Sequence, residues 1–312
     1  MHHAIAVWLT ARPWRAAIAA GFCGVLSLLI PLPFALPLPF LVPAGAIPVL
    51  VALRSDPRQA LLVAATAAAP ALWMVLPFAH TMPGVIVAVL ALMFAPVGLA
   101  LVLRRTGSLN LCFQLAVAGA AAAVVLIHVL LPDPAAFWVE VINRAVQSAK
   151  DTGLLQRNAE LDAAIAAAVT VWARTMWGAA IATALVTVLS ALFLGCWWQT
   201  LLEAPGQFGA EYRRLRLGRV LGLVVTALFV GAFMVDSALI GSLAWIALVA
   251  LTVQGLAAAH RSKASGRLKR GWLAAIYVFL IGPLPLSTAI TALALAAWGL
   301  ADNWLRPRVP AV

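Results

Sequence analysis

The chain has 312 residues, of which 64% are hydrophobic and only 10% are charged, and its formal net charge at pH 7 is +11. This composition excludes an ordinary soluble globular domain and is typical of a polytopic membrane protein. A spanning helix needs about 20 apolar residues, so the length allows about ten spans with short loops. We therefore predict an all-α transmembrane helix bundle of eight to ten spans, forming a single integral membrane domain over residues 1–312.

The N-terminal half, residues 1–131, is expected to contain five helices. An apolar run follows Arg12 and Arg15 and predicts a first helix over residues 16–30. No A-x-A cleavage site follows it, so we expect this helix to remain uncleaved. Three further apolar runs predict the third, fourth and fifth spans, at residues 59–77, 83–103 and 109–131.

Proline dominates the expected second span, because six prolines fall within residues 31–48. Each removes a backbone donor and strains a continuous helix, and irregular backbone at membrane depth persists only when it is buried in protein or lines a cavity. The segment predicts a broken helix that shapes a pocket or gate. The alternative is a Pro-rich turn followed by a plain helix over about residues 38–53. The candidate pocket residues are Pro37, Pro39, Pro43, Gln114 and His128.

Gln114 and His128 lie in the fifth span and could line a polar cavity beside the second helix. Isolated polar groups in a bundle also commonly bond to a neighbouring helix, and the sequence leaves both roles open.

Residues 132–169 form the only long hydrophilic excursion, and we expect them to be extracytoplasmic. Within them Val139, Ile142, Val146 and Ala149 recur at helical spacing, which predicts an amphipathic helix that rests on the outer surface and ends at Gly153. A lid over an outward-facing pocket is the alternative role.

The C-terminal half, residues 170–312, is expected to contain the remaining five spans. A sixth span is bracketed by Trp177 and by Trp197 and Trp198, as expected for rings at the membrane interfaces. The final apolar stretch, residues 271–304, would be about 51 Å long as one helix, well beyond a hydrocarbon core of about 30 Å. We expect it to break at residues 282–285. The other expected spans are residues 175–198, 220–235 and 239–259.

A basic segment, residues 203–219, interrupts this half and is expected to be cytoplasmic. If it is helical, Phe208, Tyr212 and Leu215 share one face, the pattern of a short helix on a membrane surface. It is either a positive loop that anchors the topology or a recognition surface for a partner or for anionic lipid. The candidate surface residues are Phe208, Tyr212, Arg213, Arg214, Arg216 and Arg219.

The distribution of charge favours a membrane orientation over nucleic-acid binding. With both termini inside, 17 of the 21 Lys and Arg residues lie on the cytoplasmic side. The four outside are Arg144, Lys150, Arg157 and Arg174. Ten spans with both ends inside therefore fit the positive-inside rule.

No energising or catalytic motif is recognisable. Ion pumps usually place charged residues inside the bundle, whereas here every carboxylate maps to a loop or a helix end. Asp236 and Asp302 come closest to the lipid. Each is either an ordinary helix-end residue or a site that couples transport to an ion. The sequence contains no phosphate-binding loop, H-E-x-x-H pair or G-x-S-x-G motif, so we predict no enzyme, no cofactor and no metal site.

Three segments of the second half carry a family resemblance: W-W-Q-T-L-L-E-A-P-G-Q-F-G-A-E-Y-R-R-L-R-L-G-R over residues 197–219, Q-G-L-A-A-A-H over residues 254–260 and G-L-A-D-N-W-L-R-P-R over residues 299–308. They resemble the YybS-like predicted bacterial membrane proteins, a family of unknown function. Ala204 and Gln207 stand where relatives would carry Asn and Gly. That family is similar in helix layout to the substrate-binding subunits of energy-coupling-factor transporters and to the cell-shape protein MreD.

The resemblance implies a bundle that binds something and relies on partners for energy. It also implies a bacterial protein, for which the expected location is the inner membrane. Two functions are open: the missing energising motif and the expected broken helices favour the first, and the arginine segment, residues 213–219, favours the second. One is a small-molecule-binding transporter subunit that works with a separate coupling protein. The other is a non-catalytic scaffold whose basic loops recruit envelope-assembly proteins. The expected partners are the lipid bilayer and one of these membrane proteins, with no nucleic acid.

Overall fold

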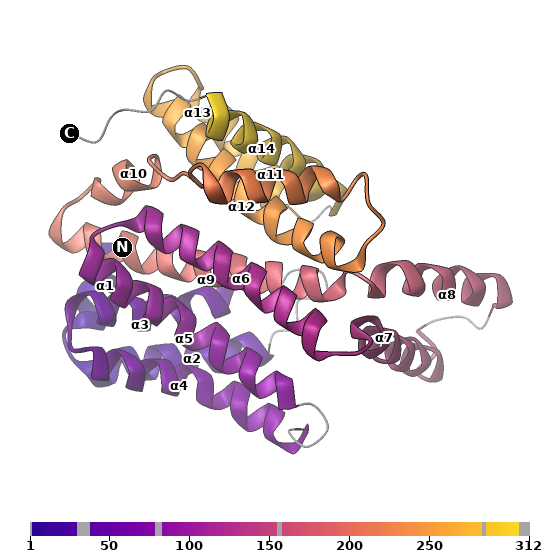
Figure 1. Ribbon diagram of the computed structural model, residues 1–312. Helices are drawn as coiled ribbons and strands as arrows, with labels where there is room; N and C mark the ends of the chain where they lie inside the picture. The colour runs from indigo at the N-terminus through magenta and orange to yellow at the C-terminus, as the bar shows by residue number, and fades with distance from the viewer. Residues whose placement is uncertain (1, 30–37, 79–82, 155–157, 283–284, 306–312) are drawn as a thin grey trace.

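The computed structural model describes residues 2–29, 38–78, 83–154, 158–282 and 285–305 (Figure 1). Every regular element in these ranges is helical. The helices are α1 (His2–Thr10), α2 (Pro13–Leu29), α3 (Leu38–Arg54), α4 (Pro57–Val75), the 3-10 turn η1 (Leu76–Phe78), α5 (Pro83–Thr106), α6 (Leu109–Leu130), α7 (Pro134–Asp151), α8 (Ala159–Ala173), α9 (Met176–Glu203), α10 (Gln207–Tyr212), α11 (Val220–Gly231), α12 (Ala238–Ala264), α13 (Arg270–Ile281) and α14 (Pro285–Leu305).

Six of the described helices are long and apolar enough to cross a membrane, namely α4, α5, α6, α9, α12 and α14. The all-helical bundle that the sequence predicts is therefore confirmed. Helices α2 and α3 have 17 residues each, about 26 Å, which is slightly shorter than a hydrocarbon core of about 30 Å. Helices α11 and α13 have 12 residues each, about 18 Å, which is shorter than a hydrocarbon core.

The second apolar run forms a continuous helix where it is described. Helix α3 contains both Pro43 and Pro48 without interruption, so the alternative, a plain helix, applies to residues 38–54. The expectation of a broken helix is wrong for this part. Proline is tolerated within membrane helices that pack against their neighbours, and α3 packs closely on α9, where a Cβ atom on Gly195 would lie 2.4 Å from the side chain of Val49. Pro39 lies in the first turn of α3, and Pro31, Pro33 and Pro37 lie outside the described residues.

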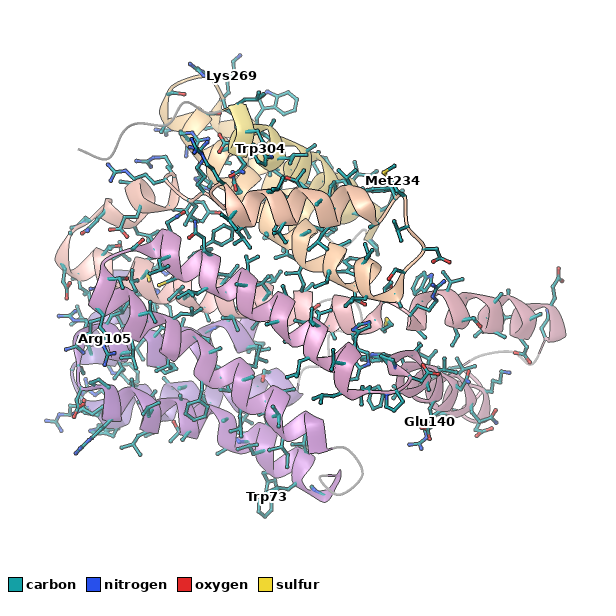
Figure 2. All side chains as sticks on the ribbon, in the orientation of Figure 1. Trp73, Arg105, Glu140, Met234, Lys269 and Trp304 are labelled. Carbon is teal, nitrogen blue, oxygen red and sulfur yellow. The ribbon has the colours of Figure 1, made fainter. Side chains whose placement is uncertain are left out.

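Two ends of the bundle differ in composition. The connections after α3, α5, α9 and α12 lie at one end with the N-terminus, at the left of Figure 1, whereas α7 and α8 lie at the other. We call these the basic end and the α7–α8 end. Figure 2 shows Arg105 and Lys269 toward the basic end and Glu140 toward the α7–α8 end, while Trp73, 81% exposed, points away from the bundle.

Close backbone contacts hold α12 against α14 in the C-terminal half. A Cβ atom on Gly255 would lie 2.0 Å from the carbonyl oxygen of Leu295, and one on Gly299 would lie 2.1 Å from that of Leu251. Only glycine therefore allows this approach. The predicted break after α13 is confirmed, since α13 ends at Ile281 and α14 begins at Pro285.

The long hydrophilic excursion contains two helices. The predicted amphipathic helix is α7, and Gly153 follows its end with a φ of +74°. The second helix, α8, begins within the excursion at Ala159 and extends beyond it to Ala173; the sequence does not predict it. Its alanine-rich sequence lacks the amphipathic pattern that made α7 recognisable.

Candidate functional site

A stretch without helix links α10 to α11 and carries the arginine-rich sequence. This connector, residues 213–219, begins after Tyr212, so the expected helix does not extend to Leu215. Leu215 and Leu217 are 0% and 1% exposed, and their neighbours Arg214 and Arg216 alternate with them. Alternation is the pattern of an extended chain, and it is the signal that could have predicted this segment.

Two side chains of α6 bind the connector backbone. The backbone N–H of Arg216 donates to Oδ1 of Asn110 at 2.6 Å. Gln114 Nε2 donates to the carbonyl oxygens of Arg216 and Leu217 at 3.0 and 3.1 Å. A buried chain without helical hydrogen bonds needs other partners for its backbone N–H and C=O groups. These side-chain amides supply the hydrogen bonds that a helix would otherwise provide.

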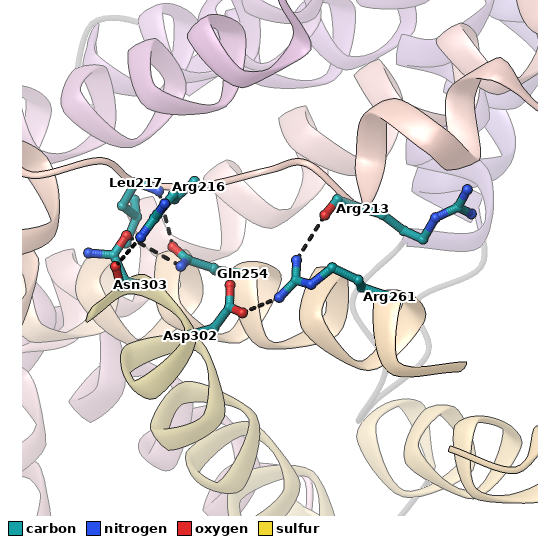
Figure 3. A network of polar contacts seen from close by, with 7 residues as sticks. All are labelled: Arg213, Arg216, Leu217, Gln254, Arg261, Asp302 and Asn303. Carbon is teal, nitrogen blue, oxygen red and sulfur yellow. Dashed lines mark hydrogen bonds and ion pairs between the residues drawn. The ribbon is translucent and has the colours of Figure 1, made fainter. Parts of the chain in front are cut away.

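Helices α12 and α14 bind the connector from its other side (Figure 3). The N–H of Leu217 donates to Oε1 of Gln254 at 3.1 Å, and Asn303 Nδ2 donates to the carbonyl oxygen of Gly218 at 3.1 Å. Arg216 Nη2 donates to the carbonyl oxygen of Asn303 at 2.8 Å. Gln254 and Asn303 are 0% and 2% exposed, so their amides are committed to this backbone.

A half-buried ion pair completes the arrangement. Arg261 of α12 pairs with Asp302 of α14, whose side chain is 9% exposed, and Arg261 Nη1 donates to the carbonyl oxygen of Arg213 at 2.9 Å. A buried charge is tolerated when it is paired and hydrogen-bonded. Asp302 lies in the last turn of α14. We call the connector with Asn110, Gln114, Gln254, Arg261, Asp302 and Asn303 the connector junction.

Aromatic rings cover α10 next to the junction. Tyr212 lies edge-on to Phe193 and His260, with ring centroids 5.4 Å apart in both pairs, and Phe208 lies 5.8 Å from Tyr212. His260 Nε2 lies 2.8 Å from the hydroxyl of Tyr277. Burial raises the pKa of the Tyr212 hydroxyl above its ordinary value, so the phenol is uncharged at neutral pH.

A cavity of about 450 Å³ opens beside this aromatic cluster at the basic end. The charged side chains that line it come from the connector, from α12, from the α12–α13 connection and from the start of α13. They are Arg213, Lys263, Lys269 and Arg270. His260, Ala264 and Leu268 complete the lining, which contains no carboxylate. We call it the cationic cavity.

A second cavity, about 860 Å³ and more open, lies at the α7–α8 end. Its walls mix small apolar residues of α7 with charged and amide groups. Glu140, Asn143, Arg144 and Gln147 come from α7, and Arg174 follows α8. Arg144 pairs with Glu140, and Arg174 pairs with Asp236 at 2.9 Å. We call it the α7–α8 cavity.

The structure separates the residues of the expected recognition surface. Arg214 and Arg219 are exposed, whereas Arg213 and Arg216 are half-buried. Phe208 and Tyr212 belong to the aromatic cluster. Their role in binding a partner or lipid stays a prediction, with Arg214 and Arg219 as its accessible part.

The expected pocket residues do not come together. Pro37 lies outside the described residues, and Pro39 and Pro43 lie in α3. Gln114 and His128 lie 14 residues, or about 21 Å, apart along α6. Gln114 binds the connector, and His128 Nδ1 lies 2.9 Å from the carbonyl oxygen of Val124 in its own helix. The sequence left open whether Gln114 lines a cavity or bonds to a neighbouring segment of the bundle. In the structure it bonds to the connector.

The fold is that of a multi-pass membrane protein, because six helices among the described residues have the length and composition to cross a membrane. Comparisons of the chain with protein-family models, with curated proteins and with solved structures found no match. Among the described residues, no group of three or more His, Cys, Asp or Glu side chains lies together as a metal site.

Proposed function

We propose that the chain is a small-molecule-binding subunit of a membrane transport system, without an energy source of its own. The observation that supports it most is the α7–α8 cavity, because its volume of about 860 Å³ lies within the usual range of ligand sites. Apolar walls with a few charged and amide groups suit a small polar solute. The connector junction lies at the opposite end of the bundle and holds the helices of that end together.

The proposed setting is the inner membrane of a bacterium, with eight to ten crossings and both termini in the cytoplasm. In this orientation the basic end faces the cytoplasm, in agreement with the positive-inside rule, and the α7–α8 cavity faces outward. The proposal includes membership of the YybS-like family, and it assigns the chain no catalytic role.

Co-purification tests the proposal. The intact protein would be isolated from native membranes in mild detergent, and the associated proteins would be identified by mass spectrometry. A transmembrane coupling protein together with ATPases is the expected result. Recovery of envelope-assembly proteins without any ATPase would contradict it.

A scaffold for envelope assembly is the second candidate, and the exposed arginines favour it. Arg214 and Arg219 lie on the connector with exposed side chains, where a protein partner could reach them. Under this candidate, replacing both by Gln abolishes partner capture while insertion is retained. Arg58→Gln, an exposed arginine at the same end, is the control.

A further inference from the structure

We propose that the cationic cavity is a binding site for a phosphate group. This goes beyond the proposed function, because a phosphate site at the basic end could serve either a transport subunit or a scaffold. The first support is composition: four cationic side chains line about 450 Å³, and no carboxylate lines it with them.

The four cations have no ion-pair partner among the described residues, although other basic side chains of the chain have one. Arg54 pairs with Glu203, and Arg261 pairs with Asp302. By contrast, Arg213, Lys263, Lys269 and Arg270 face a shared space. Like charges around one cavity repel each other, so an anion bound there removes an unfavourable interaction.

Arg213 is held in place by the connector junction. Arg261, itself paired with Asp302, binds the Arg213 carbonyl oxygen, and the Arg213 side chain points away from the junction (Figure 3). Its backbone is thus fixed before any ligand binds. A guanidinium group can hold a phosphate through two parallel hydrogen bonds, and lysines add point charges.

The start of α13 adds backbone donors. This 12-residue helix begins at Arg270, and no side chain caps its N-terminus. The Trp272 N–H already donates to the carbonyl oxygen of Lys269, and the remaining N–H groups of the first turn, together with the helix dipole, favour an anion there. These backbone donors add to the four positive side chains of the cationic cavity, whose combined charge already favours a highly charged oxyanion.

The cavity lies where both lipid headgroups and solutes can reach it. Helix α12 has 27 residues, about 40 Å, so its last turns extend beyond a hydrocarbon core of about 30 Å. Trp272, 65% exposed, follows directly in the first turn of α13, as expected at a membrane interface. The phosphate could therefore belong to an anionic lipid or to a soluble molecule.

Binding would be measured on the full chain in nanodiscs. In nanodiscs of phosphatidylcholine, inorganic phosphate and pyrophosphate would be titrated calorimetrically at constant ionic strength, with chloride as the reference anion. In parallel, retention of phosphatidic acid by the purified protein would be counted by native mass spectrometry. Saturable binding of either soluble anion identifies a soluble phosphate compound as ligand. Saturable retention of phosphatidic acid alone identifies a lipid headgroup.

The double substitution Lys263→Gln and Arg270→Gln should weaken the binding at least tenfold. The matched control is Arg267→Gln in the same connection, because Arg267 is exposed like Lys263 and Arg270 but does not line the cavity; it should change binding less than twofold. Thermal unfolding of each variant checks that the fold is retained. If the double variant does not fold, Lys269→Gln alone should weaken binding at least threefold.

Two results would overturn the proposal. One is the lack of saturable binding of phosphate, pyrophosphate and phosphatidic acid to the wild-type protein. The other is an equal loss of binding in the cavity variants and in Arg267→Gln, which would indicate diffuse surface charge. Neither result depends on whether a transport partner is found.

Discussion

The two ends of the bundle differ in the interactions that stabilise each of them. At the basic end the connector is bound by Gln254 and Asn303, both almost fully buried, and by the Arg261–Asp302 pair. At the other end α7 has no buried residue at all. It is attached to α8 by the Lys150–Asp162 ion pair. It is attached to α9 by the ring contacts of Phe137 and Trp138 with Trp177 and by the bond from Trp177 Nε1 to the carbonyl oxygen of Pro134, at 2.9 Å.

The difference follows from what each end must satisfy. The connector leaves the helical state within the bundle, so its backbone groups need buried partners from other helices. Helices α7 and α8 satisfy their own backbone and can lie at the margin of the bundle with few contacts. Free energy of unfolding should therefore be sensitive to substitutions at the basic end, and local opening should be concentrated at the α7–α8 end.

The largest effect is expected from Gly299→Ala, beside the connector junction. The new methyl group would overlap the Leu251 carbonyl oxygen, forcing α12 and α14 apart and separating Gln254 from Asn303. The expected loss is about 3 kcal/mol in the free energy of unfolding. Gly119→Ala in α6 is the control, since nothing lies within 4 Å of its Cβ position. Equal stability of the two variants would refute the close helix approach.

The second effect is the loss of the half-buried ion pair in Asp302→Asn. Arg261, 28% exposed, would keep its charge without its carboxylate, at an expected cost of about 2–3 kcal/mol. The comparison is Asp236→Asn at the α7–α8 end, where the pair with Arg174 is exposed and should contribute less than about 1 kcal/mol. Denaturant unfolding in detergent micelles measures both. Similar losses would remove the contrast between the ends.

The third effect concerns a single amide. Gln254→Leu deprives the Leu217 N–H of its acceptor and leaves Asn303 with one partner fewer, which should cost about 2 kcal/mol. Its control is Gln147→Leu in α7, whose exposed amide bonds to Asp151 in the same helix. That control should change stability by less than about 0.5 kcal/mol. A silent Gln254→Leu would show that the connector does not depend on this amide.

The smallest effect on global stability is expected from Trp177→Phe. The ring contacts with Phe137 and Trp138 can be retained, while the bond to Pro134 is lost, at about 1 kcal/mol. Because the bond attaches α7 to α9, limited proteolysis between α7 and α8 should accelerate more than global unfolding does. Unchanged cleavage would mean that other contacts hold α7.

The sequence predicted the helical class, most helix positions and the break near Gly282, because each depends on local hydrophobicity, length and proline or glycine. It also predicted α7 from its spacing. It did not predict the separate helix α8, whose alanine-rich sequence has no face to detect.

The connector junction could not be predicted because its parts are far apart in the sequence. Asn110 and Arg216 are 106 residues apart, and Gln254 and Asn303 are 49 residues apart. Each amide alone resembles an ordinary polar residue of a membrane helix. Their common role depends on the packing of α12 against α14, which glycines allow. The sequence also assigned Gln114 and His128 to one pocket, but they lie about 21 Å apart along α6, and Gln114 binds the connector.

Hydrogen–deuterium exchange of the full chain in nanodiscs tests the contrast between the ends most directly. The account predicts that the amides of Arg216 and Leu217, outside any helix but bonded to Asn110 and Gln254, exchange at least about tenfold more slowly than the helical amides of α7. Exchange of the connector as fast as that of α7, or faster, would contradict it, because the connector would then be an ordinary surface loop.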